Sequence, residues 1–238
     1  MKLSIIIPVF NESKTIKEVV NDVVKLTIPH VDKEIIIIDD CSIDNTVLEV
    51  NKLVSKNKSI HFYKHDSNQG KGAAVRTGIS HATGDYIIIQ DADLEYNPEQ
   101  IKKLVEPIYN KDAIVVFGTR LNRLPNLTKD ENRPLFLFHY FGNRFLSLIT
   151  SLLYGQWITD METCYKLFPR SALSNTRLNA KGFAFEPEIT AKLLKNGYKI
   201  MEIPITTTPR GYDEGKKLNA AKEGPLALWT LLKYRFVN

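Results

Sequence analysis

Short, fully apolar runs alternate with amphipathic segments through the first half of this 238-residue chain. The runs LSIIIPVF (3–10) and EIIIIDD (34–40) are rich in β-branched residues, which predicts buried strands. Residues 12–25, between them, carry apolar side chains at helical spacing. Further strands are predicted at 60–65, 85–93 and 113–120, and further helices at 44–55, 71–82 and 98–109. This order predicts an α/β fold with a mostly parallel, Rossmann-like sheet and helices on both faces.

The second half of the chain is less regular. Residues 121–133 are polar and typical of a loop, whereas 135–157 are unusually apolar. The apolar stretch FLSLITSLLY (145–154) is about half of the ~20 residues that span a bilayer. A core helix and an in-plane interfacial helix therefore both remain open for this segment. The same two interpretations apply to PLALWTLLKYRF (225–236), which mixes apolar and cationic residues.

The charge balance restricts the classes of partner. A formal net charge of +5 favours an anionic substrate or an anionic membrane face, with a solvated basic surface as the alternative. Nucleic acid is not expected, because no binding motif is found. Cys41 and Cys164 form neither a disulfide framework nor a metal-ligand spacing. Without a signal-peptide pattern at the N-terminus, we expect a cytoplasmic protein.

An acidic run, QDADLEYNPEQ (90–100), follows the apolar run YIII. It places Asp91, Asp93 and Glu95 at alternate positions, where the carboxylates repel one another. Side chains two positions apart at a strand end point to the same side. In a basic protein this pattern favours a hard divalent cation, Mg²⁺ or Mn²⁺, shared with substrate phosphates. The alternative is a solvated acidic turn.

Polar residues follow several of the predicted strands. In a parallel sheet the carboxyl ends of the strands meet at one edge, and ligands bind there. Lys71 lies between two glycines at a predicted helix start, so backbone access and the helix dipole both favour a bound phosphate. The polar residues expected at this edge are Asn11, Glu12, Asp39, Asp40, Asp91, Asp93 and Arg120.

Several motifs occur together in a characteristic order. They are IIIPVFNES, IIIIDDCSIDNT, NQGKGAAVRTGISHATGD and QDADLEYNP, followed by GTR. This set resembles glycosyltransferase family 2, which has the GT-A fold, and within it the polyprenyl-phosphate sugar synthases similar to dolichol-phosphate mannose synthase. The resemblance covers residues 2–120 and continues more loosely through DMETCYKLFPR (160–170), GFAFEPEI (182–189) and RGYDEGKKL (210–218). It implies one GT-A domain, in which 1–120 bind the nucleotide-sugar and the less regular 121–238 bind the acceptor.

The resemblance also implies a role for each matching position on the donor side. Asp91 and Asp93 would bridge a Mn²⁺ or Mg²⁺ ion to the diphosphate. Glu95 would be a third metal ligand, although relatives often carry Gln at this position. A turn with a helix N-cap is the alternative for residues 39–46. The implied nucleotide-binding residues are Pro8, Phe10, Asn11, Glu12, Asp39 or Asp40, Lys71, Asp91 and Ala92.

The acceptor side is implied more loosely. Asp160 would be the general base for a hydroxyl acceptor, or would orient a lipid phosphate that is already anionic. Arg120 and Arg210, with Arg144 as a further candidate, would bind phosphates of donor or acceptor, and surface ion pairing is the alternative. The catalytic candidates are therefore Asp160, Arg120 and Arg210. For Glu186 and Glu188, a helix-dipole role and sugar-hydroxyl binding both remain open.

The implied function is an inverting, cation-dependent glycosyltransferase that uses a UDP- or GDP-sugar donor. The acceptor would be a polyprenyl phosphate, dolichyl or undecaprenyl, at the cytoplasmic face of a membrane. One alternative is transfer to a hydroxyl of a glycan or glycolipid in surface polysaccharide synthesis. Another is a nucleotide-sugar-binding protein without catalysis. A dinucleotide oxidoreductase is excluded, because the turn VFNES has none of the glycines that its fingerprint requires.

Overall fold

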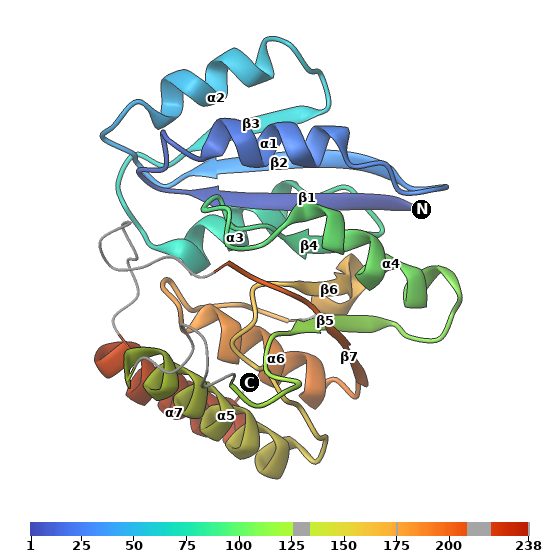
Figure 1. Ribbon diagram of the computed structural model, residues 1–238, viewed down its shortest axis with the longest axis vertical. Helices are drawn as coiled ribbons and strands as arrows, with labels where there is room; N and C mark the ends of the chain where they lie inside the picture. The colour runs from blue at the N-terminus through green and yellow to red at the C-terminus, as the bar shows by residue number, and fades with distance from the viewer. Residues whose placement is uncertain (126–133, 175, 209–219, 238) are drawn as a thin grey trace.

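The computed structural model of the protein describes residues 1–125, 134–174, 176–208 and 220–237 (Figure 1). Arg210 and the stretch 210–218 lie outside the described residues. The strands are β1 (Lys2–Val9), β2 (Asp32–Asp39), β3 (Ile60–Lys64), β4 (Tyr86–Ile89), β5 (Val115–Thr119), β6 (Lys166–Pro169) and β7 (Ile200–Pro204). The α-helices are α1 (Ile16–Lys25), α2 (Thr46–Val54), α3 (Lys71–His81), α4 (Ile101–Tyr109), α5 (Pro134–Tyr154), α6 (Phe185–Lys195) and α7 (Ala220–Phe236).

The described strands form one sheet in the order β3-β2-β1-β4-β6-β5-β7. All neighbours are parallel except that β6 runs antiparallel to both β4 and β5. In the register, Ile5 of β1 lies between Ile35 of β2 and Ile88 of β4. Every β1 residue from Leu3 to Val9 is buried, so both faces of this strand are covered. The predicted α/β fold with a mostly parallel sheet is therefore confirmed.

The antiparallel strand β6 was not predicted. It is only four residues long, KLFP, and lies between β4 and β5. A chain segment from beyond residue 160 thus enters the middle of the sheet, and the two halves of the sequence share one core. The helix predicted from residue 12 also begins later, at Ile16, because residues 11–15 form a turn in which Glu12 O accepts from Thr15 N and Ile16 N.

Sharp turns follow three strands at the carboxyl edge of the sheet. Asn11, Cys41 and Leu94 have φ angles of 52°, 65° and 63°, in the left-handed region that residues with a side chain rarely adopt. Such backbone strain persists only where the surroundings impose it, and it is concentrated at functional sites. These turns follow β1, β2 and β4, the strands whose polar residues were expected to meet.

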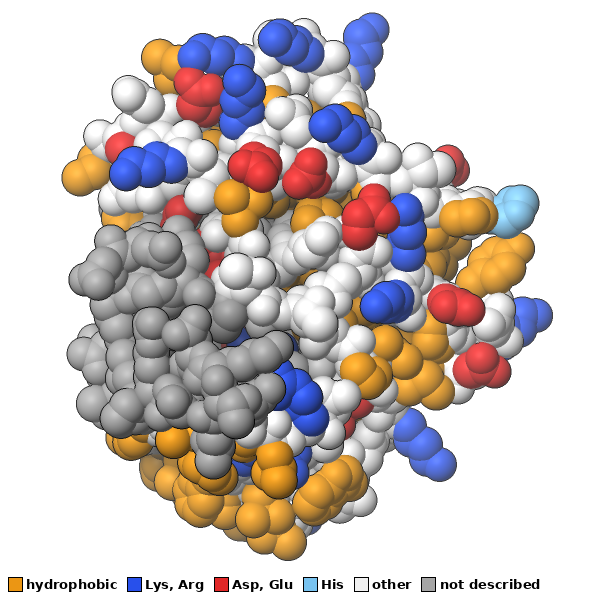
Figure 2. All heavy atoms as spheres, in the orientation of Figure 1, with side chains coloured by type: hydrophobic (Ala, Val, Ile, Leu, Met, Phe, Trp, Pro, Cys, Tyr) orange, Lys and Arg blue, Asp and Glu red, His pale blue; other side chains and the backbone are white. Residues whose placement is uncertain are grey.

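Helices α5 and α7 lie side by side at the end of the molecule away from α2 (Figure 1). No helix in the described ranges is long and apolar enough to cross a bilayer. Hydrophobic side chains gather over these two helices at the lower end of the view in Figure 2. We call this surface the α5–α7 apolar face; its exposed members are Phe138, Phe141, Phe145, Leu148 and Leu152 of α5, and Leu226, Trp229, Leu232 and Phe236 of α7.

Candidate active site

The loops after β1 and β2 are hydrogen-bonded to each other at the carboxyl edge. Asn11 N donates to Ser42 Oγ at 2.9 Å, and Asn11 Oδ1 accepts from Ile43 N at 2.9 Å. Asp39 Oδ2 accepts from Ser42 N at 3.0 Å, which is the turn role that the sequence left open. Its other oxygen, Oδ1, is buried without a hydrogen-bond partner. Asp39 thus combines a structural contact with an oxygen that is available to a ligand.

Asp40 has a different environment from Asp39. Its carboxylate accepts from Gln69 N at 2.9 Å and from Gly70 N at 2.7 Å, and it lies 2.7 Å from His65 Nδ1. Gly70 has a φ of 92°, and a Cβ there would lie 2.6 Å from Lys181 O, so glycine is required. Asp40 therefore fixes the glycine-rich loop that begins α3. Of the two predicted nucleotide ligands, only Asp39 keeps an oxygen without a hydrogen-bond partner.

Lys71, the first residue of α3, is surrounded by carboxylates. Its Nζ lies 2.7 Å from Asp91 Oδ1 and 3.4 Å from Glu186 Oε1. Lys166 is fully buried on the other side of Glu186, with Nζ 2.5 Å from Oε2. Burial acts to lower the pKa of Lys71, but the surrounding negative charges, chiefly Asp91 and also Glu186, together outweigh it, and the pKa lies well above its ordinary value. The lysine is a fixed cation beside the acidic run, as the sequence predicted.

The three predicted metal ligands follow β4 in one short turn. Asp93 Oδ1 accepts from Glu95 N at 3.1 Å, and Leu94 between them has the left-handed conformation. Within the described ranges, no three His, Cys, Asp or Glu side chains converge closely enough to hold a metal ion by themselves. The carboxylate oxygens suit Mg²⁺ or Mn²⁺ chemically, and such an ion takes its remaining ligands from phosphate and water. The assignment of Asp91, Asp93 and Glu95 stays a prediction.

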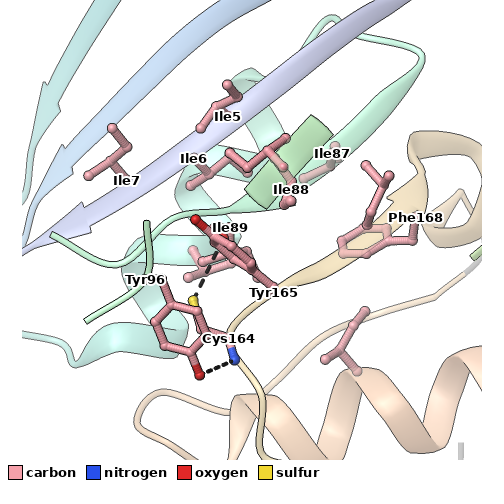
Figure 3. Close-up of a cluster of buried hydrophobic side chains, with 14 of the residues drawn as sticks. Ile5, Ile6, Ile7, Ile87, Ile88, Ile89, Tyr96, Cys164, Tyr165 and Phe168 are labelled. Carbon is pink, nitrogen blue, oxygen red and sulfur yellow. Dashed lines mark hydrogen bonds between the residues drawn. The ribbon is translucent and has the colours of Figure 1, made fainter. Parts of the chain in front are cut away.

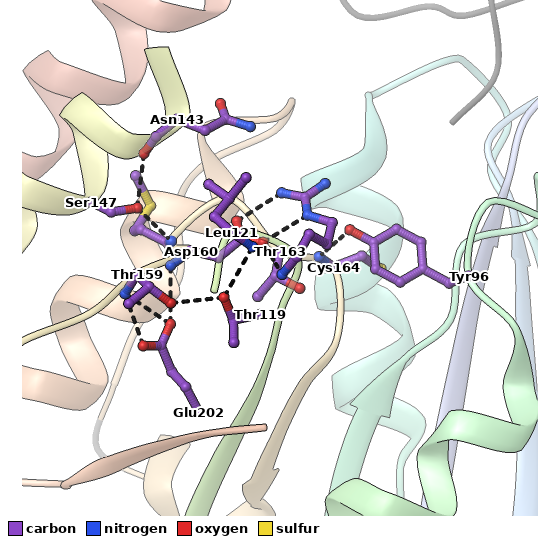
Figure 4. Close-up of polar contacts among 12 residues, drawn as sticks. Tyr96, Thr119, Leu121, Asn143, Ser147, Thr159, Asp160, Thr163, Cys164 and Glu202 are labelled. Carbon is purple, nitrogen blue, oxygen red and sulfur yellow. Dashed lines mark hydrogen bonds and ion pairs between the residues drawn. The ribbon is translucent and has the colours of Figure 1, made fainter. Parts of the chain in front are cut away.

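A second charged pair lies at the end of β5, where Arg120 binds Asp160 (Figure 4). Arg120 Nε lies 2.7 Å from Asp160 Oδ2, and NH2 lies 2.8 Å from Oδ1. Arg120 N also donates to Oδ2 at 2.9 Å. Glu202 of β7 accepts from Thr159 N and Asp160 N, which fixes the segment that carries the aspartate. Asp160 is fully buried, whereas the Arg120 side chain is 23% exposed.

Tyr96, Cys164 and Tyr165 lie beside the isoleucines of β1 and β4 in the core (Figure 3). Tyr96, within the acidic run, accepts from Cys164 N at 3.1 Å through its hydroxyl. Its ring also faces the Arg120 guanidinium, 5.8 Å from the ring centroid. Tyr165 donates to Oε1 of Gln90, the first residue of the acidic run, at 2.6 Å. Residues 160–166 therefore tie the acidic turn after β4 to the arginine after β5.

The remaining predicted residues have different environments. Arg144 NH1 donates to Leu121 O at 3.1 Å, so the side chain holds the segment after β5. Glu188 accepts from Asn179 N and Ala180 N and pairs with Lys192, which makes it a brace of the loop before α6. Pro8 and Ala92 are buried beside the edge.

Sequence reasoning missed Glu162, which lies in the chain between Asp160, bound to Arg120, and Lys166, bound to Glu186. Burial raises its pKa to about 7, partly offset by Lys166. Its Oε1 is buried and has no hydrogen-bond partner. The stretch DMETCYKLFPR (160–170), which resembles the family, could have indicated Glu162, but only Asp160 within it was assigned a role. Lys166 lies in the same stretch and was also missed, because its burial depends on its place in β6, a strand that the sequence did not predict.

The model of the family described as glycosyl transferase family 2 matches residues 4–177. The chain belongs to this family. A UDP-N-acetylglucosamine–dolichyl-phosphate N-acetylglucosaminyltransferase from Methanococcus voltae is 33% identical to it over 232 residues, covering 90% of this chain and 89% of the relative. An uncharacterized protein of Methanocaldococcus jannaschii is 28% identical over 223 residues, covering 92% and 86%.

Solved structures share the fold of this glycosyltransferase. Glucosyl-3-phosphoglycerate synthase from Mycobacterium tuberculosis, in complex with Mn²⁺, UDP and phosphoglyceric acid, has a TM-score of 0.71 at 18% identity, with 100% of this chain and 79% of that chain covered. The same synthase in complex with Mg²⁺ and UDP has a TM-score of 0.70 at 18% identity, covering 100% and 80%. The family and the GT-A fold that the motifs indicated are confirmed, and the protein is a glycosyltransferase.

Proposed function

We propose that this enzyme transfers a sugar from a UDP-sugar to a polyprenyl phosphate. The observation that carries the proposal is the likeness to the enzyme of Methanococcus voltae, whose name gives UDP-N-acetylglucosamine and dolichyl phosphate as its substrates and which aligns with 90% of this chain. In this proposal residues 1–120 bind the nucleoside diphosphate of the donor, and residues 121–238, together with Arg120 at the boundary, form the acceptor side.

The donor would bind along the carboxyl ends of β1, β2 and β4. Asp39 Oδ1, buried without a hydrogen-bond partner, is placed to accept from the base or the ribose. Lys71 and the N-terminus of α3, which Asp40 holds through the backbone of Gly70, would bind the diphosphate. Pro8, Phe10, Asn11, Glu12 and Ala92 would line the same edge.

Asp91 and Asp93 would hold the divalent cation, with Glu95 as a further candidate. Their oxygens suit Mg²⁺ or Mn²⁺, and a bound ion of this kind stabilises the departing diphosphate as a Lewis acid. Lys71, paired with Asp91 at 2.7 Å, neutralises part of the repulsion within this acidic turn. It also supplies positive charge where the diphosphate would lie.

The acceptor phosphate would bind at Arg120. Its guanidinium is partly exposed, and Asp160 occupies only its Nε and NH2 side, which leaves further N–H donors for a phosphate oxygen. Asp160 is buried and bound through both oxygens, so it is not placed to take a proton from a hydroxyl acceptor. A polyprenyl phosphate is already anionic and needs no such base. We therefore assign Asp160 as the residue that positions Arg120.

Attack of the phosphate oxygen on the anomeric carbon would form the new C–O bond as the bond to the nucleoside diphosphate breaks. One direct displacement of this kind inverts the anomeric configuration. The electron pair of the broken bond leaves with the diphosphate. Negative charge therefore develops there in the transition state, and the positive charge of Lys71 would stabilise it and so raise the rate.

The α5–α7 apolar face would lie on the cytoplasmic face of the membrane that contains the polyprenyl phosphate. Its exposed rings include Phe141 at 58% and Trp229 at 63% exposure. Lys233 and Arg235, exposed near the end of α7, could reach anionic head groups beside these rings. An apolar stripe with cations at its margin is typical of helices in the membrane interface.

The decisive experiment is a transfer assay with radiolabelled UDP-N-acetylglucosamine, UDP-glucose and GDP-mannose in Mg²⁺ or Mn²⁺. Each donor is combined with dolichyl phosphate, undecaprenyl phosphate or a glycolipid that offers only hydroxyls. We expect an organic-extractable, acid-labile product with a UDP-sugar and a polyprenyl phosphate. Transfer to the glycolipid alone would replace the proposed acceptor. Binding of UDP-sugars without any turnover would support the non-catalytic alternative.

A further inference from the structure

Buried side-chain oxygens without hydrogen-bond partners are concentrated at one place in the described part of the chain. Such atoms are rare in native proteins because each one loses its hydration without compensation. All of them lie on segments that form the candidate site, and a bound ligand would satisfy them. They are Asp39 Oδ1, Glu162 Oε1, Thr163 Oγ1 and Glu186 Oε1. Asp39 belongs to the proposed nucleotide site, which leaves the other oxygens to be explained.

The two glutamates lie between the ends of the site that the reaction needs. Glu186 is linked to the diphosphate end, because its Oε1 lies 3.4 Å from Lys71 Nζ. Its Oε2 is bound by Lys166. Glu162 lies two residues after Asp160, which binds Arg120 at the acceptor end, and four residues before Lys166, which binds Glu186. The carboxylates thus bridge the interval from Lys71 to Arg120.

Transfer requires the sugar to occupy this interval. The anomeric carbon must lie between the departing diphosphate and the attacking phosphate, so the sugar ring lies between the groups that bind them. Carboxylates are acceptors only, and they suit hydroxyl donors while repelling phosphates. Two carboxylates at this position would therefore bind sugar hydroxyls, while Lys71 and Arg120 would bind the phosphates.

We propose that Glu162 and Glu186 form the hydroxyl-binding subsite for the transferred sugar, and that Glu162 determines which sugar is accepted. This inference rests on the proposed function. Glu186 is the fixed member, since Lys166 binds one of its oxygens. Glu162 is the selective member, because its buried Oε1 has no hydrogen-bond partner among the described residues. A site with a buried acceptor of this kind rejects a sugar that lacks the matching hydroxyl.

Calorimetric binding of UDP and of UDP-N-acetylglucosamine tests the subsite without any acceptor. Glu162→Gln and Glu162→Ala are compared with wild type and with Glu99→Gln, which changes an exposed carboxylate that pairs with Lys102. We expect the Kd for UDP to change less than about twofold in both Glu162 variants. The Kd for the UDP-sugar should rise about tenfold or more in Glu162→Ala, the size of one lost charge-assisted hydrogen bond.

Deoxy-sugar donors separate direct contact from a general effect. Wild type should bind the parent sugar about tenfold more tightly than the analogue that lacks the contacted hydroxyl, and Glu162→Ala should lose this preference. Equal weakening of UDP and UDP-sugar, or the same discrimination in variant and wild type, would overturn the subsite. Glu162→Gln has nearly the same volume and carries the test if the alanine variant unfolds.

The binding result also separates this inference from the proposed function. If wild type binds UDP-sugars but transfers nothing to a polyprenyl phosphate, the acceptor assignment fails, and the deoxy-sugar comparison still decides the subsite. If wild type binds no nucleotide-sugar, both fail. If Glu162→Gln lowers only the turnover on a hydroxyl acceptor, without a change in sugar discrimination, Glu162 acts as a general base and the subsite is overturned.

Discussion

The guanidinium of Arg120 binds the carboxylate of Asp160 through two hydrogen bonds, with Nε 2.7 Å from Oδ2 and NH2 2.8 Å from Oδ1. The two residues are 40 positions apart in the chain, at the end of β5 and shortly before β6. Because the aspartate is fully buried and the arginine is partly exposed, the pair directs the guanidinium toward the edge of the site. This geometry is the basis of the proposal that the aspartate acts through the arginine rather than on the substrate.

The first prediction concerns this pair. Asp160→Asn should lower the free energy of unfolding by about 3 kcal/mol, because it leaves Arg120 without its counter-charge. It should also raise the acceptor KM more than the donor KM. Urea denaturation and initial-rate kinetics measure the two effects. Arg120→Lys keeps the charge but not the two-point geometry, and it should likewise raise the acceptor KM.

A general base would give a different pattern. If Asp160 removed a proton from the acceptor, Asp160→Asn would abolish turnover with little change in acceptor KM, and Arg120→Lys would retain most activity. That result would restore the role that the sequence left open for a hydroxyl acceptor.

The second prediction concerns the acidic turn after β4. Asp93→Asn should abolish Mn²⁺-dependent turnover and weaken Mn²⁺-dependent UDP binding at least about tenfold, since a metal-binding carboxylate is lost. The Tm should stay close to that of wild type. Asp112→Asn, at an exposed position outside the edge, is the matched control and should behave as wild type. Near-normal turnover of Asp93→Asn at saturating metal would refute the assignment.

The third prediction concerns acid stability, through Glu34. Its buried carboxylate accepts from Ser4 Oγ at 2.5 Å and from Thr83 N at 2.6 Å, and it pairs with Lys2 at 2.6 Å. Burial acts to raise the pKa, but the contacts with Lys2, Ser4 and Thr83 outweigh it and lower the pKa to about 2. The ionised form is thus stabilised by folding, and this contribution is lost as the pH falls from about 4.5 to 2.

Glu34→Gln should therefore lower the free energy of unfolding at pH 7 by roughly 2 to 3 kcal/mol. The difference between variant and wild type should shrink as the pH falls below about 4.5. Urea denaturation at pH 7, 4 and 3 measures it. The exposed Glu106→Gln is the control and should not differ from wild type at any pH. A constant difference across the pH series would contradict the linkage.

The fourth prediction concerns the α5–α7 apolar face. Phe141→Glu and Trp229→Glu should each reduce binding to vesicles that contain anionic phospholipid by about tenfold, the effect of one large side chain leaving an apolar phase. Sedimentation with sucrose-loaded vesicles measures the bound fraction. Leu48→Glu, at an exposed position on α2 (51%), is the control. Equal binding of all three variants would show that the face does not contact the membrane.

The fifth prediction concerns pH and the donor. Burial raises the pKa of Glu162 to about 7, so the fraction of carboxylate that can accept from a sugar hydroxyl grows between pH 6 and 8. The affinity of wild type for a UDP-sugar should therefore increase over this range, relative to its affinity for UDP. Glu162→Gln cannot ionise, and its ratio of the two affinities should stay flat. A pH-dependent ratio in this variant would assign the titration to another group.

The repeated isoleucine runs and the amphipathic segments between them predicted β1, β2 and β4 and the helices that follow them. These patterns record burial, and burial is a local property that the order of apolar residues expresses directly. The glycines around Lys71 and the alternation of Asp91 and Asp93 likewise depend only on neighbouring positions. The family motifs are also contiguous stretches of sequence. The sequence alone therefore determined the fold class and the family.

The tertiary structure alone decided which carboxylate binds which partner. Asp39 and Asp40 are adjacent, yet Asp40 is bound by backbone from residues 69–70, while Asp39 keeps a buried oxygen without a partner. Asp160 meets Arg120, and Lys166 meets Glu186, because β6 and the segment before it enter the sheet between β4 and β5. A charged group takes its role from the charges and donors around it, and distant segments supply those once the chain has folded.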